Sequence, residues 1–538
     1  MLLTLNIGRN FAIGGKMKEE ILKVIKEKGL LLEKDVFELM NNLAEEGIVR
    51  SLLEKIEERS GQKIITRALL SQYFSSVQEI TRELSGEKQK EIEHIFVKLG
   101  LSIEIKRSSV MEKETQRVKK ENKGGYQLFY ADTKAEKKLE VGDFVGSFKA
   151  RYQQLQRILM QRAELHNGLI SIGKLGGERQ QISIIAMVKE KRITKNGNMI
   201  IVFEDLTGEV GGIVKSDNRE LFDIAEELQL DDVVGIKASG NRDLVFVHNI
   251  VFPDSFLNEK TKFEEDICAA FVSDLHCGSD RHLRENFERF LEWLNKDENA
   301  RKIKYLFFIG DNVDGVGIFP NQENVLALKS MKGQYDLFAS YLKKIPKDIT
   351  IFIAPGQHDA CRVAEPQPLI NKRYAPGLYE MENAVLITNP CFVKLIEGDK
   401  EFKILVYHGA SMHTFINEIK ELRIMKAHKC PAKTVKHMLK RRHLSPTHGS
   451  ASGIYIPYAE NDPLVITEVP DVFCTGEVHR LDIENYHGTL IITGSCWQAQ
   501  TPYEEKVGNE PDPNKVPVLN LKTRELKIYD FSKKEDEK

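Results

Sequence analysis

The amino-acid sequence predicts a multidomain protein of mixed class, in which a helical N-terminal domain and a small β domain precede a larger α/β domain. Three patterns in the 538 residues lead to this prediction. A helical apolar period runs through the first part, alternating apolar residues follow in the middle, and five separate apolar runs fill the last half. We place the four segments at residues 1–85, 86–140, 141–260 and 261–538.

Residues 1–85 have the pattern of a small helical domain. Apolar residues recur three and four positions apart with charges between them, as in Ile21, Val24 and Ile25. Gly29 and Gly47 stand where helices are expected to end. We interpret this segment as a docking module.

Residues 86–140 are expected to be a flexible, charged linker. They are rich in Lys and Glu, and they contain few apolar residues after Ile105. Such a composition does not bury enough apolar surface to offset the entropy of ordering the chain.

Residues 141–260 have the strand pattern of an OB-fold β-barrel. After a helical stretch, residues 182–188 and 199–205 alternate around a turn at Asn196-Gly197, which is a strong hairpin signal. Further strands at 209–214, 233–238 and 245–251, with a helix before the last two, complete a five-stranded pattern. The barrel either binds a single nucleic-acid strand or packs against its neighbour, and Phe203 is its one candidate for an exposed stacking aromatic.

Composition excludes several classes of protein. The net charge of −2 excludes a uniformly basic nucleic-acid coat, so any contact with DNA must come from a local patch. Seven scattered cysteines without Cys-x-x-Cys spacing argue against a zinc ribbon and a disulfide framework, and favour a reducing, cytoplasmic location. No apolar run approaches the roughly 18 residues of a membrane span, and the start, at Met1 or Met17, lacks a signal-peptide pattern.

Residues 261–538 carry acidic or imidazole side chains at the ends of five predicted strands. These candidates are Asp274 and His276, Asp311 and Asp314, Gln357 with His358 and Asp359, His408, and Glu477 with His479. One such residue alone is more often turn or surface chemistry. Because open α/β sheets gather their sites at the carboxyl ends of strands, the recurrence predicts a metal centre.

The order Asp-x-His, Gly-Asp-x-x-Asp, Gly-x-His-Asp, His-Gly, Gly-x-x-His resembles the calcineurin-like metallophosphoesterase superfamily. The resemblance implies a four-layer α/β/β/α fold and two divalent ions, Mn²⁺ or Mg²⁺, that serve phosphoester hydrolysis. It implies that Asp274, His276 and His479 bind the first ion, Asp311 bridges both ions, and His408 binds the second. It also implies that His358 is the general acid and that Asp314 orients it.

Gln357 and Glu477 depart from the superfamily pattern, which has Asn and His at these two positions of the second metal subsite. Either residue can ligate a hard ion, so both are kept as candidate ligands. The two changes together could also mark loss of function.

An OB-fold before a metallophosphoesterase domain resembles the small subunits of archaeal family D DNA polymerases. The segments 440–446 and 494–501 look like signatures of that family. The resemblance implies a large catalytic subunit as partner, nucleoid-associated replication, and 3′→5′ exonuclease activity on single-stranded or mispaired DNA ends. Two alternatives stay open: a catalytically impaired scaffold, and a stand-alone phosphoesterase or repair nuclease.

A basic stripe lies between the fourth and fifth strand ends. Five of its residues are candidate DNA contacts: Lys433, Lys436, Lys440, Arg441 and Arg442. Spacing of three or four residues places most of them on one helix face, where they could neutralise a DNA backbone. A solvated face, or one that pairs with an acidic surface on the large subunit, is the alternative.

Overall fold

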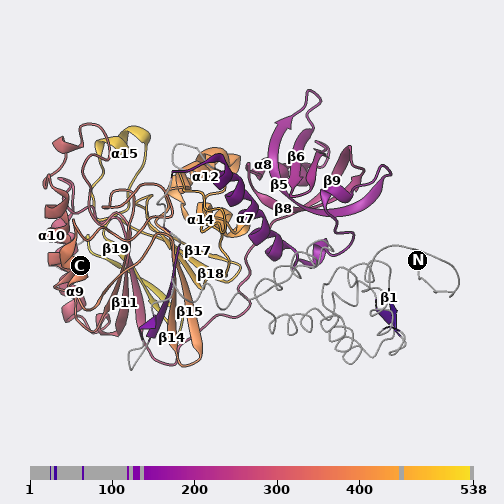
Figure 1. Ribbon diagram of the computed structural model, residues 1–538. Helices are drawn as coiled ribbons and strands as arrows, with labels where there is room; N and C mark the ends of the chain where they lie inside the picture. Colours follow the sequence, from indigo (N-terminus) through magenta and orange to yellow (C-terminus); the bar gives the residue numbers. More distant parts are fainter. Residues whose placement is uncertain are drawn as a thin grey trace. The chain divides into compact units, whose positions relative to one another are not determined.

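The computed structural model describes residues 118–119, 125–131, 133, 138–447 and 454–532, together with residues 25, 30–32 and 64–65 (Figure 1). The chain forms two compact units, Met1–Glu112 and Lys113–Lys538. Within the described ranges, every helix is too short or too polar to cross a membrane.

In the N-terminal unit, a short parallel pair joins β1 (Leu31–Leu32) to β2 (Ile64–Ile65). The sequence prediction did not include this pair. The predicted helical domain otherwise lies almost entirely outside the described residues, so it stays a prediction.

The middle of the chain forms the five-stranded barrel that the sequence predicts. Its strands are β5 (Gln180–Ile193), β6 (Met199–Asp205), β7 (Gly208–Val214), β8 (Val233–Gly240) and β9 (Leu244–Val251), closed in the order β5-β6-β7-β9-β8. Helices α7 (Val141–Leu159) and α8 (Arg219–Glu227) flank it. The prediction for Phe203 was wrong: its side chain is fully buried in the barrel core, because it lies on the inward face of β6.

The last part of the chain contains two sheets packed face to face. The first has the order β13-β12-β11-β10-β19-β20, and the second β17-β18-β16-β15-β14-β4-β3. Apolar side chains from both sheets fill the space between them, as Phe271, Phe307 and Ile404 illustrate. Strands of the first sheet are β10 (Cys268–Val272), β11 (Ile303–Ile309), β12 (Thr350–Ala354), β13 (Ala384–Leu386), β19 (Lys515–Asn520) and β20 (Leu526–Asp530).

Strands of the second sheet include β14 (Cys391–Glu397), β15 (Lys400–Val406), β16 (Val472–Thr475), β17 (Asp482–Tyr486) and β18 (Thr489–Thr493). Helices cover the outer faces of both sheets (Figure 1). The helices α9 (Arg284–Lys296) and α10 (Met331–Leu342) share a core with the first sheet, and α12 (Met412–Glu418) and α14 (Ala432–Arg441) share one with the second. These packings give the α/β/β/α layering that the resemblance implies.

The predicted linker ends earlier than expected. Within residues 86–140, β3 (Val118–Lys119) and β4 (Gly125–Tyr130) belong to the second sheet, and β4 pairs antiparallel with β14. Tyr126 and Leu128 are buried because strand alternation points both toward the core between the sheets. The alternating apolar residues of this strand were a signal that the surrounding charges obscured.

Candidate metal centre

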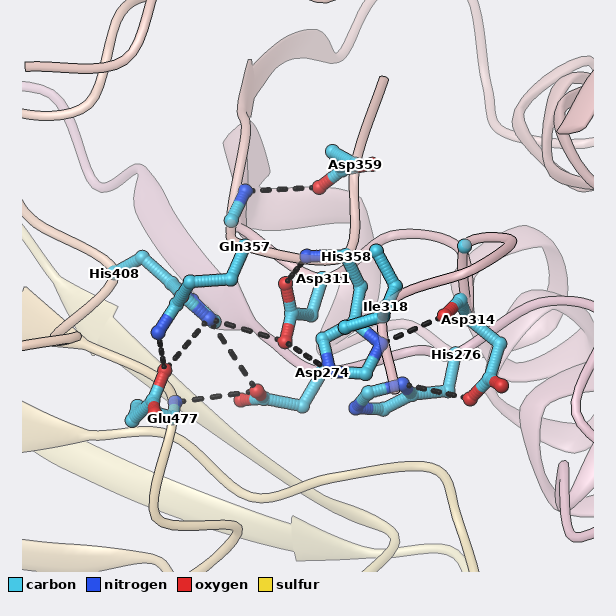
Figure 2. A network of polar contacts seen from close by, with 12 residues as sticks. Asp274, His276, Asp311, Asp314, Ile318, Gln357, His358, Asp359, His408 and Glu477 are labelled. Carbon is cyan, nitrogen blue, oxygen red and sulfur yellow. Dashed lines mark hydrogen bonds and ion pairs between the residues drawn. The ribbon is translucent and has the colours of Figure 1, made fainter. Parts of the chain in front are cut away.

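Five strand ends meet at one edge of the two sheets. β10, β11 and β12 are parallel neighbours, so the loops that follow them carry Asp274, Asp311 and His358 to the same edge. β15 and β16, also parallel, bring His408 and Glu477 from the second sheet. Figure 2 shows these side chains converging on one another.

The backbone takes a costly conformation at this edge. Five of the candidate ligands have a positive φ: Asp274 (51°), His276 (48°), Asp311 (46°), Glu477 (71°) and His479 (56°). Non-glycine residues persist in this region only where the surrounding structure fixes them, and such residues concentrate at functional sites.

Two glycines allow the chain to approach the carboxylates closely. A Cβ on Gly356 would lie 2.2 Å from Oδ1 of Asp311, and one on Gly476 would lie 2.6 Å from Oδ2 of Asp274. Any side chain at either position would push into the centre, which explains the glycine in both motifs.

Asp274, His276 and His479 form the first group. Nε2 of His479 lies 3.5 Å from Oδ1 of Asp274 and 3.1 Å from Nε2 of His276. One donor atom from each residue lies within 4.8 Å of the other two, a spacing that suits ligands of one cation.

Asp311 and His408 form a second group with Asp274. One donor atom from each of these residues again lies within 4.8 Å of the other two. Oδ2 of Asp311 lies 3.3 Å from Nε2 of His408. Nδ1 of His408 donates a 2.7 Å hydrogen bond to the carbonyl of Ile309, which leaves Nε2 as the lone-pair nitrogen facing the carboxylates. Asp311 also accepts the main-chain N–H of His358 at 2.9 Å, so its position is fixed from the adjacent loop.

Gln357 and Glu477 lie together on the side of His408. Nε2 of Gln357 donates to Oε2 of Glu477 at 2.7 Å, and the same oxygen lies 3.3 Å from Nε2 of His408. His413 approaches the other oxygen, with its Nε2 3.2 Å from Oε1. The glutamate is therefore held from three directions.

Two buried oxygens at the centre have no hydrogen-bond partner, Oδ2 of Asp274 and Oε1 of Gln357, and Nε2 of His408 is flanked only by carboxylate oxygens at 3.3 Å. An unpaired buried polar atom costs about 1–3 kcal/mol of folding free energy. A bound ligand that accepts lone pairs would therefore stabilise the site. A divalent cation meets that requirement. The residues present fit a metal centre.

Charge supports the same conclusion. Burial alone would lower the pKa of His408, but the carboxylates of Asp311, Glu477 and Asp274 raise it well above the ordinary value. Burial alone would raise the pKa of Asp311, yet His408 and His358 hold it below the usual range. The excess of negative charge that favours a proton on His408 equally favours a cation in the proton's place.

His358 lies beside these ligands and is 22% exposed. Its Nδ1 donates to the main-chain carbonyl of Asp314 at 2.6 Å, and its Nε2 stands 3.9 Å from Oδ2 of Asp311. The carboxylate of Asp314 contacts a different residue, Nδ1 of His276, at 3.1 Å. Asp314 thus orients His358 through its backbone and His276 through its side chain, a division that the sequence did not predict.

Other residues of the site escaped the sequence analysis. Oε1 of Glu504 accepts from Nδ1 of His479 at 2.9 Å, and the capping box with Thr501 at the start of α15 (Pro502–Val507) fixes that glutamate. A carboxylate behind a histidine is a common second contact of metal ligands. The signal was the Thr-x-x-Glu motif, but nothing in the sequence connects it to His479.

Residues of the basic stripe form ion pairs within the chain. Arg441 is buried at 2% exposure, and it pairs with Asp232 and Glu227 of the barrel domain at 3.1 Å and 3.2 Å. Nζ of Lys440 also reaches Glu227, at 2.7 Å. Because these acids come from the barrel domain, the interpretation as a DNA-contacting face does not hold for this end of the stripe.

The other three candidate DNA contacts also have partners within the chain. Lys433 pairs with Glu484 at 2.7 Å, and Lys436 lies over the ring of Tyr486. Arg442 is buried and donates to the carbonyls of residues 466 and 467. The acidic partners of Lys433, Lys440 and Arg441 thus belong to this chain, whereas the alternative prediction placed such a surface on the large subunit.

Comparison with known proteins agrees with this architecture. A family model that describes the B subunits of DNA polymerases alpha and epsilon matches residues 269–481. The DNA polymerase II small subunit of Methanothermobacter thermautotrophicus is 36% identical over 403 residues, which are 73% of this chain and 80% of that protein. This chain belongs to the family of archaeal DNA polymerase II small subunits.

Membership in this family confirms the resemblance drawn from the sequence. The family's representative in Pyrococcus furiosus is also 36% identical, over 72% of this chain and 64% of its own length. Among solved structures, a novel archaeal phosphodiesterase is 14% identical over 49% of this chain and 99% of its own, with a TM-score of 0.24.

Proposed function

We propose that this chain is the nuclease subunit of a heteromeric replicative DNA polymerase. In this proposal it removes nucleotides from single-stranded or mispaired 3′ ends in a metal-dependent reaction, and a separate large subunit carries polymerisation. Family membership supports the polymerase assignment. The site geometry supports the nuclease activity.

One observation carries the nuclease proposal: the cluster of carboxylate and imidazole side chains where the superfamily pattern has its metals contains buried oxygens without a hydrogen-bond partner, Oδ2 of Asp274 and Oε1 of Gln357. Asp274, His276 and His479 would hold one ion, His408, Gln357 and Glu477 the other, and Asp311 both. Carboxylate, amide and imidazole donors suit Mn²⁺ or Mg²⁺. Bound divalent ions would supply Lewis-acid stabilisation of the phosphodiester oxygens and activation of water.

His358 is the proton donor in this proposal. Its Nδ1 is fixed by the Asp314 carbonyl, so Nε2 points toward the carboxylate cluster, where the leaving oxygen would lie. Burial alone would lower the pKa of His358, but Asp311 and the Asp314 carbonyl raise it above the ordinary value, which favours the protonated ring that a general acid needs.

The test uses the purified full chain, 3′-labelled single-stranded DNA and Mn²⁺, with and without chelator. We expect release of mononucleotides that the chelator stops. Asp311→Ala should abolish cleavage and lower bound metal, whereas Asp266→Ala, an exposed carboxylate on the same domain, should change neither. Wild-type cleavage by Asp311→Ala would overturn the proposal.

A catalytically impaired scaffold is the second candidate. The replacement of the superfamily's Asn and His by Gln357 and Glu477 favours it, because both changes fall in the second metal subsite. The scaffold predicts no chelator-sensitive cleavage by either the free chain or the assembled polymerase.

A further inference from the structure

A short apolar loop stands beside the candidate metal centre. It follows Asp314 and exposes three large apolar side chains in four residues: Val316 is 43% exposed, Ile318 36% and Phe319 45%. Adjacent exposed apolar groups cost free energy in water, and clusters of them often mark binding surfaces.

Hydrogen bonds to two buried glutamine side chains fix the backbone of this loop. The main-chain N–H of Gly315 donates to Oε1 of the buried Gln334, whose Nε2 donates back to the Gly315 carbonyl. Oε1 of the buried Gln322 accepts the N–H of Ile318 at 2.9 Å. These bonds present the apolar side chains in a defined position.

The loop touches His358. The carbonyl that orients this imidazole, that of Asp314, directly precedes the loop. A Cβ on Gly315 would lie 2.6 Å from the carbonyl of His358 and 2.7 Å from Cγ1 of Ile318. Figure 2 shows Ile318 next to His358. Ile318, one of the three exposed apolar side chains, therefore lies beside the proposed proton donor (Figure 2).

The proposed reaction determines which nucleotide lies there. Removing a 3′-terminal nucleotide adds water to the last phosphorus and breaks its bond to the 3′-oxygen of the penultimate nucleotide. The terminal nucleotide leaves as a 5′-monophosphate, and the penultimate 3′-oxygen takes the proton from His358. The group beside His358 is therefore the penultimate nucleotide, which becomes the new 3′ end.

We infer that Val316, Ile318 and Phe319 form a platform for the base of the penultimate nucleotide when that base is unpaired. This inference rests on the proposed nuclease function. An unpaired base offers an open apolar face to a platform, whereas a paired base is stacked on its neighbours within the duplex. The platform thus selects ends at which the penultimate base is unpaired.

The test combines loop variants with altered DNA. Phe319→Ala and Ile318→Ala are compared with Ile193→Ala, an exposed residue on the barrel hairpin. The substrates are a single-stranded oligonucleotide, the same strand abasic at the penultimate position, the same strand abasic five positions further in, and bis(p-nitrophenyl) phosphate. The full chain is used throughout, with Mn²⁺.

We expect Phe319→Ala to raise KM for the intact strand about tenfold, which is within the effect of one lost stacking contact. The strand that is abasic at the penultimate position should show no difference between wild type and variant. Turnover of bis(p-nitrophenyl) phosphate, and the behaviour of Ile193→Ala, should match wild type.

Equal KM values for Phe319→Ala and wild type on the intact strand would overturn the platform. So would a loss of the same size on the strand that is abasic at the penultimate position. If the variants cleave normally but bind the polymerase large subunit less tightly, the loop is a protein-docking surface. If wild type cleaves none of the four substrates, the nuclease proposal itself has failed.

Discussion

Nε2 of Gln357 donates a 2.7 Å hydrogen bond to Oε2 of Glu477. These are the two positions at which the chain departs from the superfamily pattern, and they contact each other. The longer Gln357 reaches the oxygen of Glu477 and still leaves its own Oε1 free and buried. The two departures therefore form a matched pair, which argues against independent loss of ligands.

Glu477→His should lower nuclease activity about tenfold or more, because Gln357 and His413 lose the acceptor that orients them. The double variant Gln357→Asn with Glu477→His recreates the superfamily pattern and should recover part of the loss. Initial rates and metal content of the two single variants and the double variant check this coupling. Higher activity in Glu477→His alone would show that the present pair is a defect.

His358→Ala should slow cleavage about 10²–10⁴-fold, as expected for loss of a general acid. Bound metal should stay near the wild-type amount, because the superfamily pattern places His358 beside the ions rather than on them, and the Asp314 carbonyl holds its Nδ1. Single-turnover rates and elemental analysis on the same preparation separate the two effects. A parallel loss of metal would make His358 a ligand.

Arg441→Ala should reduce the free energy of unfolding by about 3–5 kcal/mol, because it leaves the buried carboxylate of Asp232 without its guanidinium partner, while Glu227 keeps Lys440. Lys433→Ala breaks a more exposed pair with Glu484 and should cost under about 1 kcal/mol. Denaturant unfolding of both variants gives the comparison. DNA binding that falls with Arg441→Ala while stability is unchanged would restore the DNA-contact interpretation.

Stability should fall as pH drops from about 6.5 to 4, in part because of His443. Its Nε2 hydrogen-bonds to Oδ2 of Asp462, and its Nδ1 accepts the N–H of Ser445, so the neutral ring is satisfied at both nitrogens. Burial, aided by Arg151, lowers the pKa of His443 to about 4.

Proton binding determines the direction of this effect. Between pH 6.5, the approximate pKa of an unfolded histidine, and the lower pKa of His443 in the folded chain, the unfolded chain binds a proton that the folded chain does not. The free energy of unfolding therefore decreases as the pH drops, by up to about 3 kcal/mol. His443→Gln should flatten this part of the pH profile, measured as Tm from pH 4 to pH 8. An unchanged slope would assign the acid sensitivity to other groups.

Local motifs made the candidate centre predictable, whereas its supporting contacts depend on distant segments. Asp274 and His276, or Gln357 and His358, are neighbours after a single strand, so the strand pattern alone locates them. Glu504 contacts His479 from a separate helix. Arg441 pairs with acidic residues that lie more than 200 positions earlier in the chain, and local sequence does not show this pairing.

The N-terminal unit should be dispensable for assembly with the large subunit, provided that the truncation respects the second sheet. The compact C-terminal unit begins at Lys113, and β4 within it supplies the buried Leu128 opposite Val393 of β14. A chain lacking residues 1–112 should therefore co-purify with the large subunit and unfold like wild type.

Deleting residues 1–139 removes β4. The edge of β14 is then exposed, and the core between the sheets is uncovered. The truncated chain should lose several degrees of Tm and aggregate, because an open apolar edge strand pairs with other chains. Comparing the two truncations separates docking from folding. Loss of the complex with the shorter deletion, while Tm is kept, would show that residues 1–112 carry the interface.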